Sequence, residues 1–323
     1  MKRYLYLLLI FAVVAPSVIS CGEEELNPES IIAIEHETQN DFDKWLEANY
    51  VDPYNILVKY RYEMDEAGYT YWTIPASLDN SIIMAHLVKY ICIDTYDEVA
   101  GIEFTRKYFP KMFFYTGEWE YKNNGTFILG TAEGGKKIFL AGLNYLPKYI
   151  TSITDLNHYY LKTIHHEFTH ILNQTKDFPS EYRQVTPTNY INDDWNEDDF
   201  EDYYRQRGFI SAYSQDSPRE DFAEMLSLYI TNSVEKWEEW MELAGRKVTA
   251  EDVDNTECHI SFPDLKEGDN FPGDVLINTK LGIVRKYMSS TFGIDIDELR
   301  SVVLRRQNEV IAGSVDLTSL SVE

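Results

Sequence analysis

Two histidines separated by three residues are the feature of the sequence with the clearest chemistry. They stand in the segment His166-Glu167-Phe168-Thr169-His170. Residues four apart lie on the same face of a helix, so both imidazoles can bind one metal ion while the glutamate lies beside its open position. The pattern predicts a Zn2+ site in which Glu167 accepts a proton from the water that attacks a carbonyl group. A pair of solvated histidines is the alternative.

A helix predicted over residues 156–174 carries this motif. At 100° per residue, its apolar side chains fall in one stripe that should pack on the core. The stripe consists of Leu161, Ile164, Phe168, Ile171 and Leu172. His166 and His170 fall on the opposite side, which we expect to border a cleft. His165 falls near the stripe, so we expect it to be packed in the core and not to bind metal.

A zinc ion in a protein usually has at least three protein ligands, and the two histidines supply only two of them. The metzincin extension is excluded, because Asn173 and Lys176 stand where that motif has glycine and histidine. A helix predicted over residues 218–231 offers Glu220 and Glu224 instead. These like charges are four apart on a helix that is apolar nearly all round, so each carboxylate needs a partner.

The expected partners of these two glutamates differ. We expect Glu220 to bind the metal and Glu224 to accept the free N–H of a ligand histidine. The alternative for Glu220 is a capping box, because Ser217 precedes it by three residues and Pro218 occupies the first helical position. The histidine motif upstream favours the metal.

On these residues, the sequence resembles the gluzincin-type metallopeptidases related to anthrax toxin lethal factor. The likeness covers residues 155–232, in which the two histidines are followed by Tyr213 and, seven residues later, by Glu220. It implies a zincin-like fold with an active-site helix. It also implies three zinc ligands, which are His166, His170 and Glu220.

The resemblance further implies roles for residues around the metal. Glu167 would activate the water, Tyr213 would stabilise the oxyanion, and Glu224 would lie behind the ligands and support them. One departure is Thr169, which stands where lethal factor has glycine. This difference concerns helix packing and substrate access more than metal binding.

The first twenty residues predict an export signal. Lys2 and Arg3 precede an apolar stretch that is too short to span a bilayer, and small residues then lead to Cys21. This pattern resembles a bacterial lipoprotein signal and implies that Cys21 is lipidated. The acidic start of a predicted tether over residues 21–30 resembles the surface-export signal of Bacteroides-type lipoproteins. A plain secretory signal with an incidental cysteine is the alternative.

Composition and the signal together narrow the partners. The chain has 54 acidic and 29 basic residues and a net charge of −25, which repels phosphate groups and argues against nucleic acid. The signal and the metal motif together resemble zinc metallohydrolase lipoproteins of Bacteroides-type bacteria, a group associated with nutrient import. This resemblance implies an outer-membrane lipoprotein at the cell surface, with an import complex as a partner.

Around the motif, the sequence predicts an α+β fold with a small mixed sheet and a helical C-terminal part. Further helices are expected over residues 41–48, 81–97, 98–108, 234–244, 275–290 and 296–311. Strands are expected over 54–62, 111–116, 126–129 and 137–141, with a turn at Asn124-Gly125. The expected domains are a catalytic domain over 31–245 and a helical region over 246–323. Cys92 and Cys258 form no framework of disulfides, and we expect both to be structural.

An acidic segment lies between the two parts of the expected zinc site. Residues 192–202 hold seven acidic side chains, and they lack the glycine and the final glutamate of a calcium loop. A solvated loop is the simpler interpretation. The alternative is a wall of the substrate cleft that favours basic side chains.

Taken together, the sequence favours a zinc-dependent metallohydrolase that acts on a peptide or protein. One alternative is a substrate-binding lipoprotein of an import system with a structural or vestigial zinc site. Another is hydrolysis of a non-peptide amide. Glu167 and Tyr213 argue against a vestigial site, since a structural metal needs neither.

Overall fold

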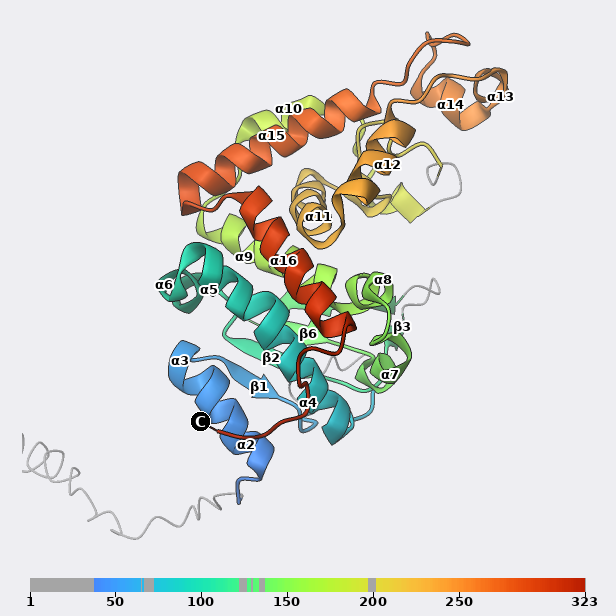
Figure 1. Cartoon of the computed structure of the whole chain (residues 1–323). Helices are drawn as coiled ribbons and strands as arrows, with labels where there is room; N and C mark the ends of the chain where they lie inside the picture. Colours follow the sequence, from blue (N-terminus) through green and yellow to red (C-terminus); the bar gives the residue numbers. More distant parts are fainter. Residues whose placement is uncertain are drawn as a thin grey trace, which may run out of the picture. The chain divides into compact units, whose positions relative to one another are not determined.

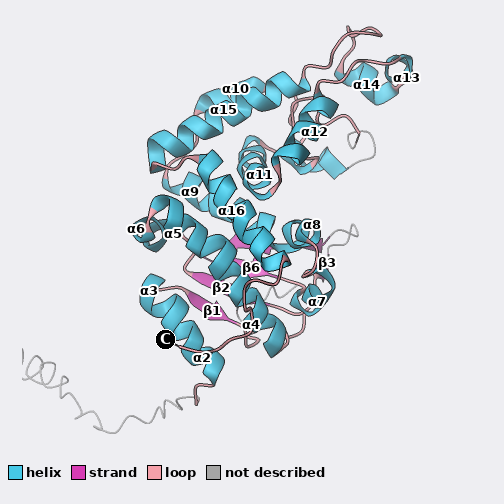
Figure 2. Ribbon diagram, in the orientation of Figure 1, coloured by secondary structure: helices cyan, strands magenta, loops and turns pink. Residues whose placement is uncertain are grey.

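A small mixed sheet lies among the helices of the computed structural model (Figure 2). The strands are β1 Leu57–Lys59, β2 Met112–Tyr115, β3 Glu120–Tyr121, β4 Phe127–Ile128, β5 Gly130–Glu133 and β6 Lys137–Leu140. The main sheet has the order β1-β2-β6-β5, in which β1, β2 and β6 run parallel and β5 runs antiparallel to β6. β3 and β4 form a separate antiparallel pair. The predicted α+β class with a small mixed sheet is confirmed.

The structure describes residues 38–64, 66, 73–121, 127–128, 130–133, 137–196 and 202–322. The predicted export signal, Cys21, the acidic tether and the turn at Asn124-Gly125 lie outside these residues. The helices and strands of the described residues all belong to one compact unit over residues 40–323. The predicted division at residue 245 stays a prediction. Within the described residues, none of the helices has the length and apolar character that crossing a membrane requires.

Helices supply most of the remaining structure. Up to the sheet they are α2 Asp41–Leu46, η2 Glu47–Val51, α3 Asp52–Tyr54, α4 Leu78–Leu87, η3 Val88–Ile93, α5 Asp94–Ala100 and α6 Ile102–Tyr108. After the sheet come η4 Leu143–Tyr145, α7 Leu146–Tyr149, α8 Ile153–Leu156, η5 Asn157–Leu161, α9 Lys162–Thr175, α10 Ser180–Val185, η6 Asn192–Asn196 and η8 Tyr213–Gln215. The last are α11 Pro218–Thr231, α12 Val234–Ala244, α13 Ala250–Asp254, α14 Thr256–Ser261, α15 Gly273–Phe292 and α16 Ile296–Ile311.

Two predicted boundaries in the N-terminal half are wrong. The helix that was expected to end at residue 97 continues through α5 to Ala100. Gly101 follows it as the C-cap, and its φ of 82° favours glycine over residues with a Cβ. The strand expected over 54–62 is reduced to β1. Tyr54 still belongs to α3, and Asn55 adopts a left-handed conformation with a φ of 53°, which separates the helix from the strand.

The helices that carry the zinc motif and the acidic pair lie against each other. α9 packs along α11, α16 packs against α11 and α5, and α15 packs against α10, α11 and α12 (Figure 1). A fully buried ion pair joins α15 to α11, with Lys280 Nζ 2.7 Å from Asp221 Oδ2. Lys280 also donates to the carbonyl oxygen of Gly208, and Tyr190 donates to Asp221. These contacts tie the C-terminal helices to the helix that holds Glu220.

Cys92 and Cys258 are both buried and unpaired. The Sγ atom of Cys92 lies 3.8 Å from His165 Nε2, inside the main core. Cys258 belongs to a small second cluster of buried side chains beside Tyr203 and Phe271. Both positions are packed among apolar groups, as expected for structural cysteines.

Candidate metal centre

The core face of α9 has the predicted composition. Ile164, Phe168 and Leu172 are fully buried, and the amphipathic stripe thereby fixes the rotation of the helix. The opposite face was expected to border a cleft with both histidines, but only His170 lines the cavity. His166 is almost fully buried against α11, with 6% of its side chain exposed, whereas His170 lies closer to solvent, with 18% exposed.

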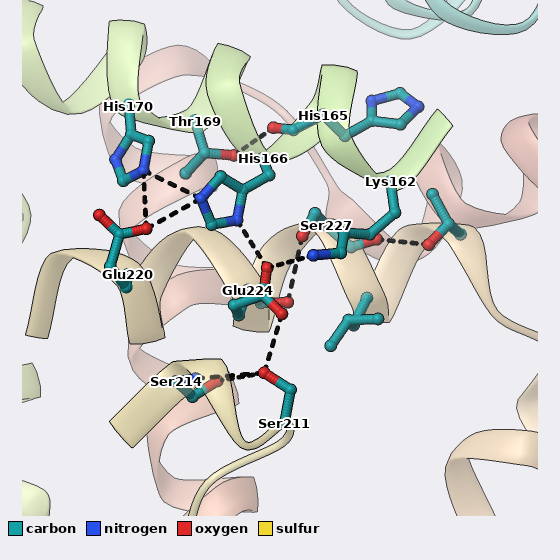
Figure 3. Close-up of polar contacts among 12 residues, drawn as sticks. Lys162, His165, His166, Thr169, His170, Ser211, Ser214, Glu220, Glu224 and Ser227 are labelled. Atoms are coloured by element: carbon teal, nitrogen blue, oxygen red, sulfur yellow. Dashed lines mark hydrogen bonds and ion pairs between the residues drawn. The ribbon is translucent and has the colours of Figure 1, made fainter. Parts of the chain in front are cut away.

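His165 is packed in the core, as predicted. Its ring lies 3.2 Å from the Tyr96 hydroxyl, and burial lowers the pKa of His165 to about 3. Its ring points away from His166 (Figure 3). Thr169 is also buried, and its hydroxyl donates to the carbonyl oxygen of His165 at 2.7 Å. This bond within the helix satisfies the hydroxyl of the residue noted above as a departure from the resemblance.

The start of α11 decides between the two interpretations of Glu220. Ser217 caps the helix, and its hydroxyl accepts from the backbone N–H of Glu220 at 3.4 Å, with Pro218 in the first turn. The Glu220 carboxylate does not complete a capping box, because it turns toward the two histidines. The cap therefore fixes the backbone while the side chain stays available for a cation.

Three donor atoms converge between α9 and α11. His166 Nε2 lies 3.0 Å from Glu220 Oε2 and 3.0 Å from His170 Nε2, and His170 Nε2 lies 3.2 Å from Glu220 Oε2 (Figure 3). Ligand atoms placed 2.0–2.1 Å from a tetrahedral zinc ion lie about 3.3 Å apart. The donor set and its spacing therefore fit a zinc ion. Among the described residues, the ligand atoms of His166, His170 and Glu220 all lie within 4.8 Å of one another, as the ligands of one metal ion must.

Glu224 lies behind His166. Its Oε1 atom is 2.7 Å from His166 Nδ1 and 2.6 Å from Lys162 Nζ, and its Oε2 accepts from the Ser211 hydroxyl at 2.8 Å (Figure 3). Only 2% of the Glu224 side chain is exposed. A carboxylate in this place fixes the orientation of the imidazole so that Nε2 faces the metal position. The contact with His166 was predicted, but those with Lys162 and Ser211 were not.

The electrostatics of the cluster favour a cation. Burial opposes charge on His166, but hydrogen bonds with Glu220 and Glu224 outweigh it and raise the pKa of His166 to about 9. Burial also disfavours the charged form of Glu220, yet hydrogen bonds with both histidines hold its pKa well below the usual value. For Glu224, burial is outweighed by the positive charge of Lys162, so its pKa is also lowered. The negative charges of Glu220 and Glu224, which would hold a proton on His166, would also attract a metal cation.

Tyr213 lies next to the cluster, at the start of η8. Its ring centroid is 6.0 Å from that of His166. Burial raises the pKa of Tyr213 well above its usual value, and the negative charge of Glu220 adds to the effect. The hydroxyl therefore stays protonated at neutral pH and can donate a hydrogen bond.

A cavity of about 520 Å³ opens beside the cluster. Glu167 lines it together with the ligand candidates His170 and Glu220. The other lining residues are Asn173, Gln174, Asp177 and Arg219. The structure thus brings together His166, Glu167, His170, Tyr213, Glu220 and Glu224, as the sequence predicted. Their catalytic and metal-binding roles stay predictions.

The α+β fold and the donor set define a zincin-like metallopeptidase scaffold. The chain belongs to the family described as "Putative zinc-binding metallo-peptidase", whose model matches residues 35–297. It is similar to a crystal structure described as a "putative zinc-binding metallo-peptidase" from Bacteroides caccae, at 35% identity and a TM-score of 0.68. That match covers 87% of this chain and 96% of the other. Comparison with curated proteins gives no match.

Proposed function

We propose that the protein is a zinc-dependent peptidase. The observation that carries the proposal is the arrangement of His166, His170 and Glu220 as three converging donors, with Glu167 lining the adjoining cavity. A structural zinc site is normally closed by four protein ligands, whereas a catalytic site has three and keeps one position open. The described residues offer three.

Each residue of the site has a chemical task in this proposal. Zinc bound to the three donors would polarise the substrate carbonyl and make water more acidic. Glu167 accepts a proton from the attacking water and returns it to the amine that leaves. The Tyr213 hydroxyl, which burial keeps protonated, donates a hydrogen bond to the oxygen that becomes negative. Glu224 and Lys162 hold the His166 ring in place.

The test is a comparison of three purified proteins: wild type, Glu167→Gln and the control Glu238→Gln, which changes an exposed glutamate on α12. Bound zinc and hydrolysis of a mixed peptide library are measured for each. We expect zinc in all three, and a loss of turnover of about 10²- to 10⁴-fold in Glu167→Gln alone. Absence of zinc uptake by the wild type, or full activity of Glu167→Gln, would refute the proposal.

The same experiment separates the competing functions. A substrate-binding lipoprotein would retain peptides without cleaving them, and Glu167→Gln would bind them equally well. An amidase that acts on other substrates would lose activity in Glu167→Gln but leave the peptide library intact. The arrangement of Glu167 and Tyr213 around the donor set favours turnover over simple capture.

We further propose that the protein is anchored by lipid at Cys21 to the outer membrane, faces the cell surface and assists nutrient import. The signal-like sequence of residues 1–20 and the acidic residues after Cys21 support this location. In the native host, Cys21→Ser should move the protein from the membrane fraction to the soluble fraction. Retention of Cys21→Ser in the membrane fraction, together with an unlipidated wild-type N-terminus in mass spectrometry, would exclude the anchor.

A further inference from the structure

Among the described residues that line the cavity beside the metal centre, one has a cationic side chain, and this residue is Arg219. It belongs to the first turn of α11, directly before the ligand candidate Glu220, and its side chain is exposed. Among the described residues, Arg219 has no ion-pair or hydrogen-bond partner. A cation in the first turn of a helix is opposed by the helix dipole, so its position gives the isolated helix no benefit.

The acidic residues of the same cavity already have partners or tasks. Glu220 contacts the two histidines, and Glu167 has the role of general base in the proposed function. Asp177 lies 3.2 Å from Arg183 and accepts from the backbone N–H of Phe178. Of the charged residues that the structure describes in the cavity lining, Arg219 is therefore the one still available to a ligand.

We propose that Arg219 recognises a carboxylate of the substrate, so that the cavity selects peptides that carry a negative charge next to the cleaved bond. This inference rests on the proposed function. The planar guanidinium can donate two parallel hydrogen bonds to a carboxylate, which a neutral amide does not match. The carboxylate is either the free C-terminus of the peptide or the side chain of an aspartate or glutamate.

Binding to a protein that does not turn over tests the proposal independently of catalysis. Three zinc-loaded proteins are compared. The first carries Glu167→Gln alone, the second carries Glu167→Gln with Arg219→Gln, and the third carries Glu167→Gln with Lys286→Gln. Lys286 is an exposed residue of α15 outside the cavity lining, so the third protein has the same net charge as the second. The probes are matched peptides with free or amidated C-termini, and with glutamate or glutamine at each internal position.

We expect the charged peptides to bind about 10- to 100-fold more tightly than their neutral counterparts, as a charge-assisted hydrogen bond allows. Arg219→Gln should abolish this difference, Lys286→Gln should preserve it, and Arg219→Glu should favour peptides with lysine. If amidation of the C-terminus weakens binding, the recognised carboxylate is the C-terminus. If replacement of an internal glutamate by glutamine weakens binding, the recognised carboxylate is that side chain. Equal binding of charged and neutral peptides, or a preference for basic peptides, would overturn the inference. Turnover by Glu167→Gln would instead contradict the proposed function.

A second inference concerns Trp195, in the segment that was expected to be a solvated loop. The backbone N–H of Ile191 donates to the carbonyl oxygen of Gln215 at 2.8 Å, and that of Asn192 donates to Asp216 at 3.1 Å. These bonds hold η6 beside η8. The half-buried Trp195 ring then lies edge-on to Tyr213, with the ring centroids 5.1 Å apart and an interplanar angle of 68°.

We infer that Trp195 is a positioning residue, which holds the Tyr213 ring so that its hydroxyl reaches the carbonyl oxygen of the substrate. Tyr213 has His166 on one side and Trp195 on another. The contact energy of an edge-to-face aromatic pair is sufficient to favour one orientation of a ring over others. Without Trp195, the hydroxyl should spend less time in the productive orientation.

The test is a double-mutant cycle on kcat. Trp195→Ala should lower kcat by about 2- to 10-fold with little change in KM or zinc content, and Trp195→Phe should restore most of the loss. In the Tyr213→Phe background, Trp195→Ala should lower kcat no further. An equal fall in both backgrounds, or no fall in the first, would refute the inference. An unchanged kcat in Tyr213→Phe alone would instead count against the role of Tyr213 in the proposed function.

Discussion

Replacement of Glu224 by glutamine should weaken zinc binding although Glu224 is not expected to touch the metal. The Glu224 carboxylate is surrounded by three groups, at 2.7 Å from His166 Nδ1, 2.6 Å from Lys162 Nζ and 2.8 Å from the Ser211 hydroxyl. All three can donate, and Lys162 can only donate. Glutamine keeps the shape of the side chain but has one accepting oxygen in place of two. Its amide nitrogen must then face at least one donor.

The size of the effect follows from this mismatch. A hydrogen bond to a charged group contributes about 1.5–3 kcal/mol, and the variant loses at least one such bond. If the loss falls on His166, the imidazole is held less firmly with Nε2 toward the metal. Loss of about 2 kcal/mol corresponds to a roughly 30-fold weaker Kd for zinc, within the 10- to 100-fold range expected for partners of metal ligands.

The assay is competition for zinc with a chelator of known affinity, at pH 7 and with both proteins folded by circular dichroism. The exposed Glu238→Gln serves as the matched control and should leave the Kd unchanged. A Kd for Glu224→Gln within a factor of two of the wild type would refute the reasoning. It would mean that the contact with His166 has no influence on metal binding.

The remaining predictions concern stability. Lys280→Met leaves a buried carboxylate unpaired and should lower the free energy of unfolding by about 3–5 kcal/mol in denaturant titrations, whereas Lys286→Met on the same helix should change it by less than about 0.5 kcal/mol. Burial lowers the pKa of His86, so the unfolded chain binds more protons below pH 6.5, and stability falls from that pH downward. His86→Gln should reduce this slope by up to about 1.4 kcal/mol per pH unit if denaturant titrations are compared between pH 6.5 and 5. Gly142→Ala should lower the Tm in thermal unfolding, because its φ is 70° and a Cβ would overlap the Trp119 ring.

Helix boundaries were predictable where a capping side chain marks them. The bounds of α11, α12 and α16 agree with the prediction. Each follows a residue whose side chain accepts from a backbone N–H of the first turn, and these caps are Ser217, Ser233 and Asp295. A cap acts over three residues, so the local sequence is sufficient to specify it.

Boundaries that depend on distant contacts were not predictable in this way. β1 has only three residues, and its limits follow from parallel pairing with β2, which lies more than fifty residues away. β5 begins at Gly130 and was missed, because its sequence lacks the alternation of a half-buried strand and its pairing with β6 defines it. The short helices α10, α13 and α14 were missed as well.

The metal site shows the same division between local and tertiary information. The i, i+4 spacing of His166 and His170 fixes their common face, and the like charges of Glu220 and Glu224 indicate that each needs a partner. Neither spacing predicts how α9 and α11 pack against each other. Arg219 and Trp195 carried no signal of their own, since an exposed arginine and an aromatic residue in an acidic segment are both common.

One further signal was present but could be understood only with the packing of the two helices. Lys162, His166 and His170 repeat every four residues on α9, and Glu220 and Glu224 have the same spacing on α11. The contacts pair them in opposite order: His170 with Glu220, His166 with both glutamates, and Lys162 with Glu224. The helices are therefore antiparallel at the site, and basic and acidic groups interleave turn by turn. A parallel arrangement would bring Lys162 to Glu220 instead, and the cation of lysine would then compete with the metal for its carboxylate ligand.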